Sequence, residues 1–319
     1  SWKFKMSCNF LTASGFYPWQ TTIKNPISSS GIGLHKGDLI EITLKPSKPN
    51  SGIRFIRTDI EGDLSERTIL ASYQNVSDTN MCTTIKNKND CKISTIEHLM
   101  AALSGSGIDN IDIEINGPEV PIMDGSSKQF IDLIENSGLS KLSEKRKFLK
   151  ITKNVEIADG EKKCSLSPSN NMNFFASIDF SDKVIGKQEA SINLENFNFK
   201  DNVSKARTFG FMRDVEALRM SGLGLGGSLD NCIIIDDNEV INSEGLRFEN
   251  EFVAHKLLDA VGDIFTSGYR IQGEYRGYLC GHHMNNLLLK ELFDNEDSFE
   301  VFEVDDSLIT DSKKELLTA

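Results

Sequence analysis

The sequence has few cysteines for its length, and no two of them lie close together in the chain. Six occur among 319 residues, without a single Cys-x-x-Cys spacing. They are Cys8, Cys82, Cys91, Cys164, Cys232 and Cys280. Scattered thiols of this kind argue against a disulfide framework and against a cysteine-only zinc site. They are typical of a cytoplasmic protein whose cysteines stay reduced.

Long apolar runs are also missing. No segment approaches the ~20 residues that a membrane-spanning helix requires. Residues 1–19 are an N-terminal extension of unknown role, in which Lys3 and Lys5 precede only a broken apolar stretch. This pattern does not fit a signal peptide. We therefore expect a cytoplasmic protein with no integral membrane segment, and we take it to be a monomer.

Basic residues are outnumbered. The chain has 35 Lys and Arg against 47 Asp and Glu, a formal net charge of −12. A broad nucleic-acid surface needs clustered cations, so nucleic acid is excluded as a partner. A small anionic substrate needs only a few local cations and remains open. The length and the 39% of hydrophobic residues are enough for two domains with real cores.

Hydrophobic patterning predicts an α+β fold with strands and helices in both halves. Strands are expected at 40–44, 53–56, 111–115, 148–151, 173–180 and 232–236, and helices at 94–104, 127–137 and 252–266. The charged stretch 141–147 is the best linker candidate. We expect domain I at residues 20–140, domain II at 148–302 and an acidic tail at 303–319.

Histidine is scarce, so the neighbours of each histidine carry the information. There are five, at positions 35, 98, 255, 282 and 283. Glu97 and His98 stand together at a predicted helix start. Ser94 followed by Glu97 also reads as a capping box, which would give Glu97 a purely structural role. The alternative is that His98 binds a metal while Glu97 handles the proton of a water molecule.

His255 and Asp259 are four residues apart on a predicted helix and therefore lie one above the other. On a helical wheel they form a polar ridge with Asp263, opposite an apolar face. Such a ridge is usually solvated. Phe252 falls on the same side, however, and indicates a helix that sits between two domains. His98, His255 and Asp259 together would make a three-ligand metal site with a fourth position open for water.

Several ordered motifs resemble the UDP-3-O-acyl-N-acetylglucosamine deacetylase family. They span roughly residues 20–290. The matching segments are 31–35 (GIGLH), 93–102 (ISTIEHLMAA), 107–110 (GIDN), 117–126 (GPEVPIMDGS), 206–214 (ARTFGFMRD), 222–230 (GLGLGGSLD), 245–263 (GLRFENEFVAHKLLDAVGD) and 281–286 (GHHMNN). The resemblance implies two domains, each a sheet layered on helices, with the helices packed between the two sheets.

The resemblance also implies a zinc-dependent hydrolase of the lipid A pathway that removes an acetyl group from an acylated UDP-glucosamine. One Zn²⁺ per chain would be held by His98, His255 and Asp259. Glu97 would be the general base and His282 the general acid or cationic stabiliser, with Asp263 orienting His282. Thr208 would help to hold the oxyanion, and Lys256 would contact the substrate near it. His283 receives no role.

Residues 206–231 match the insert that wraps the fatty acyl chain in this family, although alone they would read as an ordinary amphipathic helix and glycine loop. The resemblance places Phe180 and Lys162 against the nucleotide. It places the acyl chain against Phe209, Phe211, Met212, Val215 and Gly227, and it makes Leu34 a further substrate contact. Leu279 stands where related enzymes often carry a basic residue.

Two other functions fit parts of the sequence. One is a zinc amidase acting on a different nucleotide sugar, against which the apolar insert argues. The other is a binding protein for nucleotide sugar or lipid without catalytic activity. The complete set of Glu97, His98, His255, Asp259 and His282 argues against that second alternative.

Overall fold

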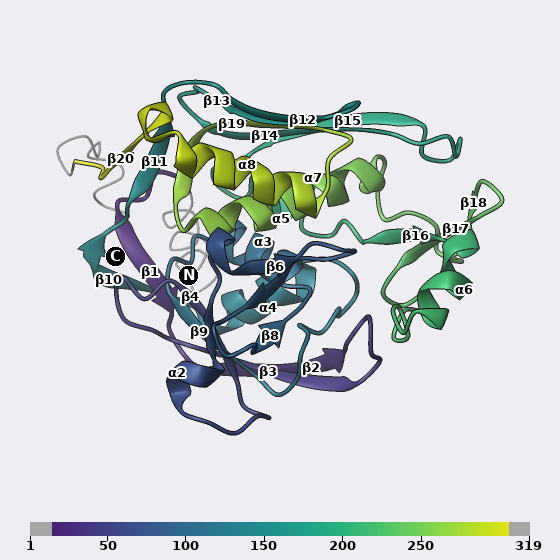
Figure 1. Cartoon of the computed structure of the whole chain (residues 1–319), viewed down its shortest axis with the longest axis horizontal. Coiled ribbons are helices and arrows are strands. Elements are labelled where there is room, and N and C mark those ends of the chain that lie inside the picture. The colour runs from purple at the N-terminus through teal and green to yellow at the C-terminus, as the bar shows by residue number, and fades with distance from the viewer. Residues whose placement is uncertain (1–14, 306–319) are drawn as a thin grey trace, which may run out of the picture.

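The computed structural model describes residues 15–305 of the chain and forms a layered α+β fold (Figure 1). One sheet lies above and another below, and the principal helices pack between them. The expected fold class and the position of the helices between the sheets are confirmed. Most of the expected N-terminal extension and of the acidic tail lies outside the described residues. Within 15–305, no helix has both the length and the apolar character needed to cross a bilayer.

The lower sheet has five strands in the order β2-β3-β9-β4-β5. Their bounds are Ile27–Ile32, Leu39–Lys45, Ile111–Ile115, Ile53–Arg57 and Thr68–Leu70. Alternation decides which side chains of β9 face the helices: Ile111, Ile113 and Ile115 are fully buried, while the residues between them are partly exposed. This strand has the bounds that its sequence predicts.

Two helices of the first half pack on this sheet. They are α3 (Glu97–Ser106) and α4 (Lys128–Ser137), and the short α2 (Leu64–Arg67) lies at the sheet's edge. The expected end of α4 at Gly138 is confirmed, with φ at +85°. A small sheet of β6 (Val76–Asp78), β7 (Thr84–Lys86) and β8 (Lys92–Ile93) leads into α3.

The upper sheet belongs to the second half and centres on β19 (Arg270–Tyr278). This long strand pairs with β11, β13 and β14, whereas β12, β15 and β20 lie at the sheet's margins. The bounds of these six strands are Phe148–Ile151, Lys162–Ser167, Met172–Asp179, Val155–Asp159, Lys187–Asn193 and Phe299–Phe302. The helix α5 (Asn198–Asn202) follows β15.

The charged stretch expected as a linker is part of a strand. β10 (Leu139–Lys145) pairs antiparallel with β1 (Trp19–Ile23) to form a two-stranded sheet. Its side chains are exposed or half-buried, and for that reason the stretch is rich in charge. Lys141 and Lys145 place their ammonium groups over the Trp19 ring, 4.4 and 4.5 Å from its centroid. The division into domains on either side of it stays a prediction.

Helices α7 (Glu251–Ile264) and α8 (His282–Asp294) lie under the upper sheet. The expected helix at 252–266 is confirmed as α7, continued by a 3-10 turn at Phe265–Ser267. Thirteen of its fourteen residues are buried. The polar ridge is therefore not a solvated face, and the position of Phe252 predicted this correctly.

The segment between α5 and α7 projects at one end of the molecule (Figure 1). It contains β16 (Phe209–Phe211), α6 (Met212–Met220), β17 (Ile233–Asp236) and β18 (Glu239–Val240). The amphipathic pattern at 206–221 is thus divided between a short strand and a helix, and α6 has no buried residue. The apolar side chains of α6 are left partly exposed beside the glycine-rich run.

Gly262 allows α7 to approach α3 closely. A Cβ atom at this position would lie 2.0 Å from the carbonyl oxygen of Glu97 and 3.1 Å from the amide nitrogen of Ala101. Both atoms belong to helix backbone, so neither can move aside alone. We predict that Gly262→Ala lowers the free energy of unfolding by about 1–3 kcal/mol, the usual cost of overpacking. Urea denaturation would measure it.

Gly210→Ala is the matched control, since the nearest atom to a Cβ there is the Cys232 sulfur at 4.0 Å. If the two variants have the same urea midpoint, the packing of α3 against α7 does not require glycine at position 262.

Candidate metal centre

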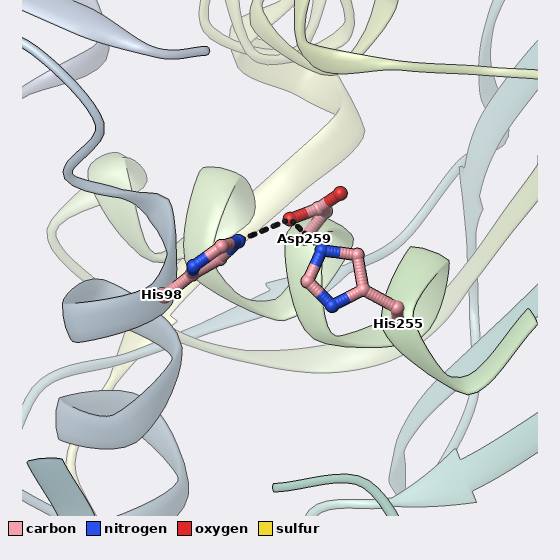
Figure 2. A group of neighbouring side chains, drawn as sticks. All are labelled: His98, His255 and Asp259. Carbon is pink, nitrogen blue, oxygen red and sulfur yellow. Dashed lines mark ion pairs between the residues drawn. The ribbon is translucent and has the colours of Figure 1, made fainter. Parts of the chain in front are cut away.

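Three side chains from two helices converge between the halves of the molecule (Figure 2). His98 comes from the first turn of α3, whereas His255 and Asp259 lie one turn apart on α7. Each imidazole Nε2 is 3.4 Å from the same Asp259 oxygen, Oδ1. The two rings are nearly perpendicular, with centroids 4.9 Å apart. The predicted ligand set therefore does come together.

The donor set fits a cation. Asp259 Oδ1 is buried and has no hydrogen-bond partner within the described part of the chain, and distances of 3.4 Å are long for hydrogen bonds. His255 Nδ1 is 2.9 Å from the Ala206 carbonyl oxygen. Because that nitrogen donates to the carbonyl, His255 Nε2 carries a lone pair directed at Asp259. His98 Nε2, His255 Nε2 and Asp259 Oδ1 therefore face one another and are the three atoms that could bind a cation.

Burial and neighbouring charge keep His255 neutral and Asp259 ionised at neutral pH, and these are the forms that bind a metal. Burial lowers the pKa of His255 to about 4, although Asp259 partly opposes it. Burial alone would raise the pKa of Asp259, but the imidazoles of His255 and His98 hold it below its ordinary value. Burial likewise disfavours protonated His98, yet the neighbouring carboxylates of Asp259 and Glu97 raise its pKa. A metal would therefore compete with a proton at His98.

A second group adjoins the first. Ligand atoms of Glu97, Asp259 and His282 lie within 4.8 Å of one another. His282 stands at the start of α8, with Nε2 3.5 Å from Glu97 Oε1 and Nδ1 2.8 Å from Asp263 Oδ2. Burial opposes its charge, but Asp263 and Glu97 outweigh burial and raise the pKa of His282 to about 10. His282 is thus a cation held between two carboxylates.

Glu97 does not form the alternative capping box. The N-cap position of α3 is Ile96, and Ser94 instead forms an isolated β-bridge with Glu119. The Glu97 carboxylate accepts a hydrogen bond from the Thr83 amide at 3.2 Å. Burial raises its pKa, against the opposing charges of His282 and His98. A carboxylate with a raised pKa beside a metal-type centre suits proton transfer.

Sequence reasoning missed the residues that hold Asp263. The Thr83 hydroxyl donates to Oδ1 at 2.7 Å, and the Asn285 amide donates to Oδ2 at 2.9 Å. The buried Tyr275 hydroxyl in turn donates to Asn285 Oδ1 at 2.5 Å. Only Asn285 carried a sequence signal, because it belongs to the segment 281–286. Thr83, just before β7, and Tyr275, on β19, reach the site from distant segments.

Thr208 and Lys256 flank the centre. Thr208 follows Ala206, the acceptor for His255, by two residues, and its amide donates to the Gly125 carbonyl at 2.8 Å. Lys256 lines a small cavity together with Asp259, Cys280 and Asn285. Its ammonium nitrogen lies 5.7 Å from the centroid of the Phe209 ring.

The predicted substrate contacts fall into separate groups. Phe180, Phe209 and Phe211 form an aromatic cluster, with centroid separations of 5.8, 5.7 and 6.4 Å. Leu34 and Gly227 are neighbours, since a Cβ on the glycine would be 3.6 Å from a leucine methyl. The remaining three lie on other elements: Lys162 at the start of β13, and Met212 and Val215 on α6.

Two other histidines lie apart from the centre. His283 is exposed, with Nδ1 3.4 Å from the Thr79 hydroxyl. His35 is buried and has no hydrogen-bond partner on its ring among residues 15–305. Its amide donates to Glu119 at 2.9 Å.

A buried ion pair fixes the segment that carries Ala206 and Thr208. Arg207 donates from Nε to Glu251 Oε1 at 2.8 Å and from a terminal nitrogen to Oε2 at 3.1 Å. Glu251 is the first residue of α7 and is fully buried. The pair therefore ties residues 206–208 to the helix that bears His255 and Asp259.

Two imidazoles and a carboxylate around one point, with a second carboxylate and a histidine beside them, form a candidate metal centre of the kind that hydrolases use. Residues 20–294 match the family described as LpxC, UDP-3-O-acyl N-acetylglycosamine deacetylase. The chain belongs to this family.

Individual relatives are similar over most of their length. Three of them are named UDP-3-O-acyl-N-acetylglucosamine deacetylase. The Campylobacter jejuni protein is 44% identical over 282 residues, covering 88% of this chain and 94% of its own. The Shewanella violacea protein is 43% identical over 285 residues, or 89% and 92%. The Haemophilus influenzae protein is 42% identical over 290 residues, or 90% and 94%.

The Arg207–Glu251 pair gives a stability prediction. Arg207→Met leaves the Glu251 carboxylate buried without its cation, so the free energy of unfolding should fall by about 3–5 kcal/mol. Lys163→Met is the control, because the Lys163–Glu156 pair is about half exposed and its loss should cost about 1 kcal/mol or less. Equal urea midpoints for the two variants would show that the buried pair does not stabilise the fold.

Proposed function

We propose that this protein is a zinc-dependent amide hydrolase that removes the N-acetyl group of a UDP-3-O-acyl-N-acetylglucosamine and releases acetate. In lipid A biosynthesis this reaction commits the sugar to the pathway. The observation that carries the proposal is the convergence of His98, His255 and Asp259 beside Glu97 and His282. The names of the relatives indicate the substrate.

Zinc is the metal that this donor set favours. Two imidazoles with one carboxylate form a typical catalytic zinc site, whereas magnesium and calcium prefer sites made of oxygen alone. We assign one ion per chain, held by His98, His255 and Asp259. When bound, zinc would supply Lewis-acid chemistry, polarising the amide carbonyl and lowering the pKa of water to about 7.

Glu97 acts as the general base. Its carboxylate lies beside the centre, within 4.8 Å of the Asp259 and His282 ligand atoms, where it can take a proton from the attacking water. Burial raises its pKa and so makes it a stronger proton acceptor. Attack on the acetamide carbon then produces a tetrahedral oxyanion, without a covalent link to the enzyme.

His282 supplies positive charge where the oxyanion develops. It is held as an imidazolium by the hydrogen bond to Asp263, and it can donate a proton to the departing amine. Asp263 is itself fixed by Thr83 and Asn285, so the ring has little freedom to rotate. Thr208 completes the oxyanion pocket, and Lys256 contacts the substrate beside it.

The insert would receive the acyl chain. Phe209 and Phe211 lie in one aromatic cluster, and Met212 and Val215 follow on the partly exposed face of α6. Leu34 and Gly227, which are neighbours, are assigned to the same substrate. Phe180 and Lys162 are assigned to the nucleotide, and domain I (20–140) and domain II (148–302) would each contribute one side of the site.

Two rivals make different predictions. A zinc amidase for another nucleotide sugar would need no apolar passage, so the aromatic cluster beside Lys256 supports the acylated substrate. A non-catalytic binding protein would need neither a raised Glu97 pKa nor a cationic His282. Both of these features belong to the chemistry of hydrolysis rather than to binding.

Point variants should distinguish residues that bind the zinc from residues that act only in catalysis. His255→Ala removes a ligand, so we expect it to lose most of its zinc and its acetate release. Glu97→Gln keeps the side-chain shape but removes the base, so it should retain about one zinc per chain while kcat falls about 10²–10⁴-fold. Elemental analysis and an acetate-release assay on the acylated UDP-sugar would measure both.

Chelation followed by zinc addition is the control for the wild-type enzyme, with loss and recovery of activity expected. Loss of zinc from Glu97→Gln together with full zinc and rate in His255→Ala would reverse the assigned roles and sink this mechanism.

The acyl chain gives a second test. Each buried methylene contributes about 0.8 kcal/mol, so a substrate without its 3-O-acyl group should have a kcat/KM lower by roughly 10²-fold or more. Phe211→Ala should lower kcat/KM for the acylated substrate and leave the unacylated one unchanged. Equal kcat/KM values for the two substrates would favour the other nucleotide-sugar amidase.

A further inference from the structure

Two cysteines of the second half meet beside the candidate active site. Cys164 lies on β13 and pairs across the sheet with Gly277 of β19. After β19 the chain turns at Leu279, whose φ is +55°, and this turn brings Cys280 back over β13. The Cys280 sulfur is 2.9 Å from the Lys163 carbonyl oxygen and 3.2 Å from that of Tyr278.

The two thiols are close neighbours, since the Cys280 sulfur contacts the carbonyl of Lys163, the residue before Cys164, and both are free. They differ in access. Cys280 is half-buried and lines the cavity shared with Lys256 and Asp259. Cys164 is fully buried, with its sulfur 3.5 Å from the Met284 carbonyl oxygen of α8. A solute in the cavity can therefore reach Cys280, and Cys164 only through it.

The contact also divides the reactivity of the pair. The neighbouring Cys164 thiol lowers the pKa of Cys280, against burial, while Cys280 and burial together raise the pKa of Cys164. A thiolate is the form that reacts with peroxides. An accessible thiol of lowered pKa with a second thiol behind it is the usual arrangement of an attacking and a resolving cysteine.

We propose that Cys280 and Cys164 form a redox-sensitive modification site whose oxidant is a hydroperoxide. The Cys280 thiolate attacks the peroxide O–O bond, giving a Cys280 sulfenic acid and, after protonation, an alcohol or water. The Cys164 thiol then attacks the sulfenic sulfur, forming the S–S bond and releasing water. Two thiols lose two electrons, and the peroxide gains them.

The disulfide would act on the catalytic machinery through a short path. Cys280 is followed by Gly281, the N-cap residue of α8, and then by His282. A disulfide holds its two sulfurs about 2.05 Å apart, far closer than two free thiols approach each other. Closing it pulls residues 279–281 toward β13 and displaces the first turn of α8. The hydrogen bond from His282 to Asp263 is then no longer aligned.

The experiment treats the zinc-loaded full-length enzyme with hydrogen peroxide, blocks remaining thiols by alkylation and digests it with trypsin. We expect a disulfide between peptides 164–183 and 277–290 and a fall from six free thiols to four. Acetate release should fall by roughly tenfold or more, since a displacement of about 1 Å at a site can cost about 10² in rate. Dithiothreitol should restore it.

Variants separate this site from general oxidation, each compared with its own untreated sample. Cys164→Ala should keep its activity after peroxide, because no disulfide can form. Cys91→Ala removes a buried thiol from the first half and should respond like the wild type. Absence of the linked peptides, or equal loss in Cys164→Ala and wild type, would overturn the proposal. Peptide mapping detects the disulfide whether or not the protein catalyses the proposed hydrolysis, so the two proposals can fail separately.

Discussion

The close approach of α3 and α7 is the contact on which the site depends. At Gly262 the two helix backbones nearly touch, so Glu97 and His98 on one helix face His255, Asp259 and Asp263 on the other. Five ionisable side chains are thereby buried in a small volume between two sheets. Burying several charges of one sign there would greatly destabilise the fold. The cost is reduced because imidazoles lie next to carboxylates. The chemistry of the site is thus a product of helix packing, with the flanking sheets holding both helices in place.

Local patterning was sufficient to predict the elements that surround the site. Strand β9 followed from strict alternation, and α4 followed from its apolar spacing and Gly138. The sandwiched position of α7 followed from a single residue, because Phe252 lies on the otherwise polar side. His255 and Asp259 could be paired by their spacing on one helix. His98 could be added only as a hypothesis from residue type, and its catalytic interpretation rested on resemblance to a known family.

What the sequence could not predict depends on contacts between distant segments. Ser94 and Glu97 have the spacing of a capping box, yet Ser94 bridges to Glu119 and leaves the carboxylate free for the site. Thr83 and Tyr275 reach the Asp263 network from opposite halves of the chain, and no local pattern marks them. The charged stretch at 141–147 contributes to β10 because β1, more than a hundred residues earlier, offers it an edge. Such partners are decided by the fold and not by neighbours in the chain.

The unpaired Asp259 oxygen has a consequence for the life of the protein as well as for its chemistry. A buried carboxylate oxygen without a donor destabilises the folded chain, and a ligand that binds only the folded state stabilises it by mass action. The gain is about 2.7 kcal/mol at a free ligand concentration one hundred times Kd. Molecules that acquire no ion would therefore unfold more often and be degraded sooner. Metal supply would in this way set how much of the protein accumulates, independently of how fast each copy works.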